Sequence, residues 1–213
     1  MRKFSTFLLL VFFSLGFGQT YQFDFLTKYA STNSKNKTTK ETVTFNNSDD
    51  FSYYLKLRKT EDDLNATLYD YKKNLAHNFS VQETKVNGAI RFEFTYLNTA
   101  KLQTSISPKN YRYEFAEISA NTPKVVSLKV YQSKRAKNPA AVQILTLEKS
   151  NKNLIPLYHS EFTHLYHKND NVSKLGNYIV SKAVEKYKNF TCEVVLKEHK
   201  NVDLRITLPN KLK

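Results

Sequence analysis

The stretch Ile90–Tyr96, IRFEFTY, decides the fold class of this chain. Its apolar side chains stand at every second position and alternate with Arg91, Glu93 and Thr95. An extended chain sends successive side chains to opposite faces, so one face of this stretch would be buried and the other wet. The same residues on a helix would not form one apolar stripe. We therefore predict an antiparallel β-strand with one face against the core.

The same period of two recurs along the rest of the chain. It is seen over residues 21–25, 51–58, 111–115, 126–130, 142–144, 192–196 and 202–208. Polar clusters such as Asn46–Asp50 and Ser150–Asn153 separate these stretches and are typical of turns. Asn87-Gly88 suits a tight hairpin turn, which needs positive φ. The pattern therefore predicts a mainly β fold, built as an antiparallel meander.

Helical signals are few. The apolar residues of the segment 178–187 fall on one helical face, but the segment follows Gly176-Asn177, and we favour a strand there over a helix. Asn98–Ser105 and the stretch around Ala116–Ala120 each have room for a turn or two of helix. No repeat or linker divides the chain, so one domain is expected.

The first residues predict export. Arg2 and Lys3 precede the apolar run Phe4–Phe13, which is too short to span about 30 Å of hydrocarbon as a membrane anchor. We expect residues 1–18 to be a cleavable signal peptide and residues 19–213 to form a single antiparallel β domain. The one cysteine, Cys192, lies far from this segment and gives no lipid anchor after it. The expected location is the periplasm or the extracellular space, and the lack of a disulfide framework favours a bacterial envelope.

Positive charge dominates the composition. The formal net charge of +14 becomes +12 when Arg2 and Lys3 are removed with the signal peptide. Only six of the 33 basic residues are arginine, whereas specific recognition of phosphates and bases favours the bidentate arginine side chain. Nucleic acid is therefore not expected as a partner. Peripheral contact with acidic lipid head groups is compatible with the charge.

Three of the five histidines lie in Leu157–His167, LYHSEFTHLYH, and raise the question of a metal site. We read this stretch as an extended strand beginning near Pro156, which would separate His159 from His167 by roughly 26 Å at about 3.3 Å per residue. No single ion spans that distance, so neither a metal nor any other cofactor is expected. On a helix, His164 and His167 would instead be neighbours.

Motifs for catalysis are missing from the sequence. It has no Gly-x-Ser-x-Gly, no His-Glu-x-x-His and no phosphate-binding glycine loop. Cys192 alternates with Val194 and Leu196 on the apolar side of a predicted strand, where a free cysteine is usually an inert hydrophobe, although His199 follows nearby. We therefore predict a protein that is not an enzyme and has no catalytic residues. A hydrolase with a site assembled from distant residues stays as a third alternative.

Two parts of the sequence carry a family resemblance. The segment TCEVVLKEHKNVDLRITLPNKLK, residues 191–213, is read as two strands joined at Lys200-Asn201 and resembles the last strands of the outer-membrane lipoprotein carrier (LolA/LolB-like) superfamily. TFNNSDDFSYYLKL at 44–57 and LYDYKKNLAHNFSV at 68–81 resemble secreted proteins of Bacteroidetes-type bacteria, including relatives of the GLPGLI family, although that motif is absent. The superfamily resemblance implies an unclosed, strongly curved antiparallel sheet or half barrel whose concave face holds acyl chains beneath short helices.

Function is predicted from the size of the aromatic face, since such a surface must close on itself, pack on another layer, or bury itself in a ligand or partner. We expect a lipid-like apolar ligand on the concave face of the curved sheet. The residues expected to bind it are Phe23, Phe25, Tyr53, Phe92, Phe94, Tyr96, Tyr111, Tyr113 and Phe115. The alternative is a structural or protein-interaction module of the cell envelope with no small ligand, because aromatic residues on one strand face are normally core.

Overall fold

The computed structural model describes residues 18–60, 63–86, 89–102, 111–119, 121, 123–162 and 174–212. These residues form one sheet of eleven strands and a short helix. The elements are β1 (Thr20–Asn33), β2 (Thr39–Asn46), β3 (Tyr53–Lys59), β4 (Leu64–Asp70), β5 (Leu75–Val86), β6 (Ala89–Lys101), β7 (Arg112–Ser119), β8 (Lys124–Tyr131), β9 (Ala141–Lys149), α2 (Ile155–Phe162), β10 (Tyr178–Tyr187) and β11 (Thr191–Thr207). The prediction of a mainly β fold with few short helices is confirmed.

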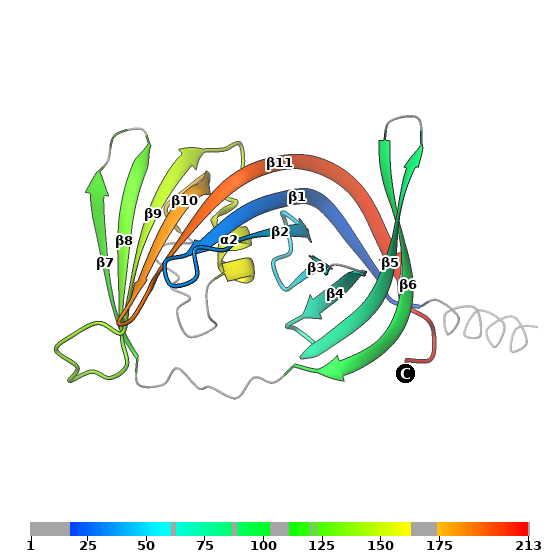
Figure 1. Cartoon of the computed structure of the whole chain (residues 1–213), viewed down its shortest axis with the longest axis horizontal. Coiled ribbons are helices and arrows are strands. Elements are labelled where there is room, and N and C mark those ends of the chain that lie inside the picture. The colour runs from blue at the N-terminus through cyan, green and yellow to red at the C-terminus, as the bar shows by residue number, and fades with distance from the viewer. Residues whose placement is uncertain are drawn as a thin grey trace, which may run out of the picture.

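The sheet consists of two meanders that meet at its centre. The strand order is β6-β5-β4-β3-β2-β1-β11-β10-β9-β8-β7, and every neighbouring pair of strands is antiparallel. The first and last strands, β1 and β11, pair with each other and form a long arch over the molecule (Figure 1). The two edges are β6 and β7, which do not pair, so the curved sheet is unclosed, as predicted.

The sheet carries its buried apolar residues on opposite faces in its two halves. Leu26 belongs to one core and Tyr29 to another, and an odd spacing of three along β1 places these two side chains on opposite faces. Around β1–β6 lies an aromatic core made of Tyr21, Phe23, Leu26, Phe45, Leu55, Leu57, Ala66, Leu68, Phe79, Val81, Ile206 and Leu208. Around β8–β11 lies an aliphatic core made of Tyr29, Val126, Leu128, Val130, Ala141, Leu145, Leu147, Ile155, Tyr158, Val180, Ala183 and Val194.

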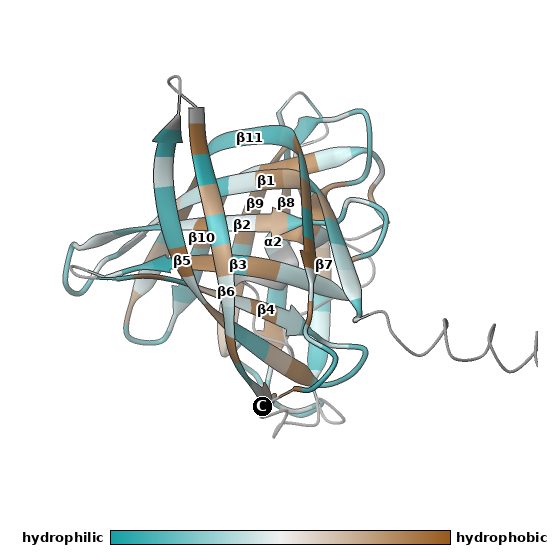
Figure 2. Ribbon diagram, turned by 90° about the vertical axis from the view of Figure 1, so that its right-hand side faces the viewer, coloured by the Kyte–Doolittle hydropathy of each residue, from teal (hydrophilic) through white to brown (hydrophobic). Residues whose placement is uncertain are grey.

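The half that contains the aromatic core is rolled. The rings of Phe45 on β2 and Phe92 on β6 meet edge to face with centroids 6.2 Å apart, although three strands separate β2 from β6 in the sheet. Figure 2 shows hydrophobic and hydrophilic bands alternating along β5 and β6, as the period of two predicts. The hydrophobic positions of these strands face the inside of the roll.

The aliphatic core is covered by α2, which lies beneath the arch of β1 and β11 (Figure 1). The prediction of an extended strand from 157 is therefore wrong for residues 157–162. Asn153 Oδ1 accepts a hydrogen bond from the Ile155 amide at 3.3 Å and begins the helix. Pro156 stands in the first turn, where its missing amide proton costs nothing. The α2 residues Leu157 and Tyr158 are buried.

Three further local expectations can be compared with the structure. Residues 178–187 form β10, so the strand favoured there is confirmed. The helical turns expected at 98–105 and 116–120 are wrong over 98–101 and 116–119, which continue β6 and β7. The two strands expected to join at Lys200-Asn201 are one 17-residue strand, β11, whose pairing with β1 shifts register twice. Asn87 and Gly88 lie outside the described residues, between paired strands.

The predicted signal peptide lies outside the described residues up to position 17, so its removal stays a prediction. Gly18 packs against the carbonyl oxygen of Leu208, so closely that a Cβ there would overlap it. The Leu208 amide in turn donates a hydrogen bond of 2.9 Å to the Gln19 carbonyl. Within the described part of the chain, no helix has the length and hydropathy needed to cross a membrane.

Candidate functional site

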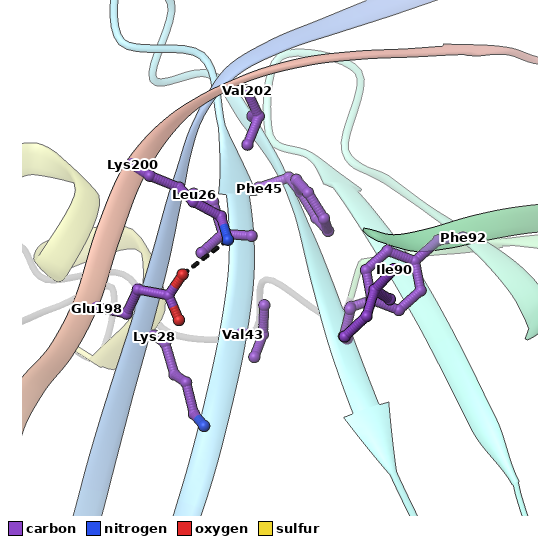
Figure 3. A pocket seen from close by; sticks show the side chains of 10 residues that line it. Leu26, Lys28, Val43, Phe45, Ile90, Phe92, Glu198, Lys200 and Val202 are labelled. Atoms are coloured by element: carbon purple, nitrogen blue, oxygen red, sulfur yellow. Dashed lines mark ion pairs between the residues drawn. The ribbon is translucent and has the colours of Figure 1, made fainter. Parts of the chain in front are cut away.

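A cavity of about 610 Å³ opens on the rolled half of the sheet. Its wall is formed by β1, β2 and β3 on one side, β11 beside them, and β6 opposite. The residues that line it are Leu26, Lys28, Val43, Phe45, Leu57, Ile90, Phe92, Glu198, Lys200 and Val202. Figure 3 shows Ile90 and Phe92 across the opening from Val43 and Phe45. The volume falls within the range of about 300–1,000 Å³ that is typical of small-molecule sites.

Strand register explains why residues so distant in sequence share this wall. Directly opposed residues of an antiparallel pair project to the same face. Leu26 lies opposite both Phe45 on β2 and Lys200 on β11, and Val43 lies opposite both Lys28 and Leu57. Alternation along each strand then adds the neighbours two residues away. The floor of the cavity is therefore the same sheet face that forms the aromatic core.

Charged groups stand along one side of the opening, on β1 and β11. Lys28 Nζ lies 2.7 Å from Glu41 Oε2, and Lys200 Nζ lies 2.7 Å from Glu198 Oε1. The hydrogen bond and charge of Lys200, and then the charge of Lys28, hold the pKa of Glu198 below its usual value. This side of the cavity is therefore a place where a carboxylate is stabilised as the anion.

The opposite side of the opening is apolar and partly unburied. Ile90 on β6 is 57% exposed, although it is a large aliphatic side chain next to Phe92. The Phe45 and Phe92 rings join the β2 and β6 sides of the cavity by their edge-to-face contact. The site thus has an apolar interior, an apolar lip on β6 and a charged lip on β1 and β11. Such an arrangement suits an elongated ligand with an apolar body and a polar end.

All nine residues predicted to bind a ligand lie within the described chain, but the structure does not bring them onto one surface. Phe92 lines the cavity. Phe23, Tyr53, Phe94 and Tyr96 pack in or against the aromatic core, and Phe23 is only 1% exposed. The other four lie on the opposite side of the sheet.

Those four residues pack in the half that carries α2. Phe25 joins Leu154 and Leu157 in a small cluster beside the helix. Tyr111, Tyr113 and Phe115 pack against the aliphatic core. Burial, followed by the neighbouring Tyr111, raises the pKa of the Tyr113 hydroxyl. A ligand in the cavity would not touch these side chains.

Sequence reasoning missed most of the cavity wall because it weighted aromatic residues. Leu26, Val43, Leu57 and Val202 are aliphatic, and nothing in their local pattern distinguishes a cavity wall from a packed core. The signal that could have found one edge of the site is Lys28, the one charged residue in the stretch Phe25–Ala30. A charged side chain at that place must reach a partner or an opening.

A second cluster of titratable groups lies in the aliphatic half and has a different character. Glu185 on β10 is buried and accepts hydrogen bonds from Tyr158 at 2.8 Å, Tyr187 at 2.9 Å and Gln143 at 3.1 Å. Burial raises the pKa of Glu185 despite these three donors, and burial together with Glu185 raises the pKa of Tyr158. Because α2 covers the carboxylate and each of its oxygens has a donor, the cluster ties α2 to the sheet.

Cys192 and the histidines give no support for catalysis or metal binding. Burial, and then the charge of Glu185, raise the pKa of the Cys192 thiol, whereas a reactive cysteine needs a lowered one. His199 stacks on Phe25 and stands seven residues along β11 from Cys192. No group of three histidine, cysteine or acidic residues in the described chain could hold a metal. His164 and His167 lie outside those residues, so the metal expectation stays a prediction.

Comparison with known proteins gives a weak likeness to a solved structure. No family model matches the sequence, and no curated protein matches it. Among solved structures, the chain is similar to a LolA superfamily protein from Nitrosomonas europaea, with 9% identity over 85% of this chain and 87% of that chain. The TM-score of 0.33 is too low for this likeness to support any conclusion about function. The case for a function therefore rests on the cavity.

Proposed function

We propose that this chain is an exported, non-catalytic binding protein that holds a lipid-like apolar ligand in the cavity between β1, β2, β11 and β6. The observation that carries the proposal is that, among the described residues, a helix packs on one of the two cores and not on the other. The aliphatic core receives Ile155 and Tyr158 from α2, whereas no helical residue of the described chain joins the aromatic core. The aromatic core instead borders a hollow of about 610 Å³.

The chemistry of the wall supports an apolar ligand. Seven of the ten lining residues are aliphatic or aromatic, so the ligand surface in contact with them gains free energy chiefly by leaving water. The three remaining residues are charged and stand together at one side, which would orient a ligand without contributing to its apolar contacts. No bond-making group is required for this role, so the proposed function is binding or carriage.

The test is lipid binding by the delipidated protein lacking residues 1–18, measured by displacement of an uncharged fluorescent hydrophobic probe. Val43→Phe should fill part of the cavity and weaken binding by about tenfold or more, equivalent to about 1.4 kcal/mol. Val195→Phe is the matched control, because Val195 is a half-buried β11 valine outside the cavity wall. Native mass spectrometry of protein purified from its own source should show a bound lipid in the wild type.

The proposal fails if the wild type binds neither a fatty acid nor a phospholipid at high micromolar concentration. Equal weakening by Val43→Phe and Val195→Phe would also contradict it, because the effect would then not depend on the cavity. Circular dichroism and the free energy of unfolding of each variant establish that loss of binding is not loss of folding.

A second candidate, an interaction module of the cell envelope, is favoured by the edges of the sheet. Leu97 on β6 is 45% exposed and Ile118 on β7 is 57% exposed, and both strands are edges. Exposed edge strands can accept a strand from another chain. The distinguishing result would be a wild type without lipid affinity that forms a site-specific cross-link in the envelope, lost in a Leu97→Lys, Ile118→Lys variant.

A further inference from the structure

We infer that the ligand is a single-chain fatty acid whose carboxylate lies between Lys28 and Lys200. This inference rests on the proposed function and names the ligand class for the same cavity. Both lysines line the cavity, and both stand on its β1–β11 side. The rest of the wall is apolar and includes Phe45 and Phe92, whose rings are in contact. A carboxylate head and an acyl tail match these two parts in order.

The spacing of the two lysines follows from the register of β1 and β11. Lys200 lies opposite Leu26, and Lys28 lies opposite Glu198, so Lys28 and Lys200 are diagonal neighbours on the same face. Diagonal neighbours of an antiparallel pair are about 7–8 Å apart at their backbones. Lysine side chains are long enough for both ammonium groups to reach one carboxylate placed between them.

Each lysine already pairs with a carboxylate of the protein, Lys28 with Glu41 and Lys200 with the cavity-lining Glu198. Lys200 bonds it, and both lysines lower its pKa, so the position favours an anion over a neutral group. The Glu198 side chain is 47% exposed and the Lys200 side chain is 57% exposed. Exposed ion pairs of this kind contribute little to the stability of the fold. A ligand carboxylate can therefore replace Glu198 as the partner of Lys200, with Glu198 turning to solvent. Figure 3 shows the ion pair at the mouth of the cavity.

Cavity size favours one acyl chain over two. A volume of about 610 Å³ is in the range for ligands of drug size, and a diacyl phospholipid would bring a second chain of the same length into it. The two lysine ammonium groups also favour an anionic head group. They would repel a cationic head group, and they would form no ion pair with a neutral alcohol. The ligand of best fit has one chain and one negative charge.

The experiment compares dodecanoate with dodecan-1-ol on the full mature chain by displacement of the same uncharged probe. The wild type should bind dodecanoate more tightly. Lys28→Met and Lys200→Met should each weaken dodecanoate binding by roughly fivefold, the upper end for a partly exposed ion pair, and should weaken dodecan-1-ol binding by a smaller factor. The preference should shrink as ionic strength rises from about 0.01 M to about 1 M.

Two further variants sharpen the test. Glu198→Gln removes the competing carboxylate and should tighten dodecanoate binding. Lys182→Met is the matched control, because Lys182 pairs with Glu193 at 3.1 Å on the neighbouring strands, is similarly exposed, and lies outside the cavity. It should change neither affinity.

Each alternative result decides the matter. Equal affinity for the acid and the alcohol would overturn the carboxylate site and leave the proposed apolar binding intact. No affinity for either compound would overturn the proposed function itself. Weaker dodecanoate binding by Glu198→Gln would overturn the exchange of Glu198 for the ligand carboxylate at Lys200. An effect of Lys182→Met equal to that of Lys200→Met would show that the general positive charge of the chain attracts the acid and that no local site exists.

Discussion

The two halves of the sheet share an alternating sequence pattern, yet one half is a packed core and the other borders an open cavity. In the aliphatic half, Leu145, Leu147 and Val180 are fully buried beneath α2. In the aromatic half, Ile90 stands 57% exposed at the lip of the cavity. The difference lies in what covers the sheet face, because both faces are equally apolar in pattern. Alternation in the sequence identifies a sheet face that must be buried. It does not identify the helix, strand or ligand that covers this face.

The largest effect is expected from a matched pair of leucines, one in each half. Leu157→Ala, on the buried side of α2, should lower the free energy of unfolding by about 2–5 kcal/mol, because the surrounding side chains cannot close the space. Leu57→Ala should cost about 2 kcal/mol or less, because Leu57 already borders the cavity and leaves little new void. Urea unfolding followed by circular dichroism measures both. Similar losses would mean that the aromatic half is as tightly packed as the other.

A second expectation concerns opposite pH dependence in the two halves. The pKa of Glu185 is raised, so between its unfolded and folded pKa values the folded state binds a proton that the unfolded state has lost. Its contribution to stability is therefore greatest below the unfolded pKa and falls as the pH rises through the folded pKa. The pKa of Glu198 is lowered, so its contribution is present at neutral pH and is lost as the pH falls through the folded pKa.

Unfolding measured from about pH 4 to pH 8 for each glutamine variant separates these contributions. Relative to Glu185→Gln, the wild type should lose stability as the pH rises above the ordinary glutamate range near 4.3. Relative to Glu198→Gln, the wild type should change less and in the opposite direction, since that carboxylate is exposed. Slopes of the same sign would contradict the assignment of one glutamate to a closed core and the other to an open mouth.

A reduced effect on stability is also expected at Phe92, which is only partly buried. Phe92→Ala should lower the free energy of unfolding by less than the roughly 3–5 kcal/mol usual for a buried phenylalanine, because its ring packs only partly against the core. Phe79→Ala should approach that range, since Phe79 is 2% exposed in the same core. Lipid affinity should nevertheless fall in Phe92→Ala, as measured by probe displacement. An unchanged affinity would place the ligand elsewhere.

Much of the fold could be predicted because the sheet obeys the period of two over long distances. The stretch Ile90–Tyr96 forms part of β6, and the ambiguous segment 178–187 is a strand. The errors fall where the period is interrupted. Register shifts occur beside Asn98, where β6 passes Asn78, and between Glu117 and Ser119 in β7. At a bulge, two successive residues of one strand lie opposite a single residue of the neighbouring strand. The alternation of apolar and polar residues that identifies a strand is lost there.

The helix α2 shows a different cause of error. Leu154 just before the helix and Ile155, Leu157 and Tyr158 within it are all buried, which is a helical spacing rather than an alternating one. Asn153 before them and Pro156 in the first turn are both ordinary signals of a helix start. The prediction of a strand instead takes the proline as the beginning of an extended segment.

The candidate site was predictable in kind but not in position. An apolar site on a curved sheet follows from the aromatic faces, and Phe92 was identified from them. Whether two strands distant in sequence face each other depends on how strongly the sheet rolls, as the contact of Phe45 with Phe92 illustrates. Twist and roll are properties of the whole sheet, and no local window of sequence contains them.

The pairing of β1 with β11 also has a consequence for the order of folding. Thr20 and Thr207 share a hydrogen bond of 2.8 Å across 187 residues of sequence, at the centre of the sheet. Contacts of such high sequence separation form slowly, because the entropy cost of closing a long loop comes before the contacts contribute any stabilising free energy. Each meander can form its own hairpins early, but the arch that joins them must await the last strand. A chain still threading through an export channel would therefore stay incompletely folded until its C-terminal strand had crossed.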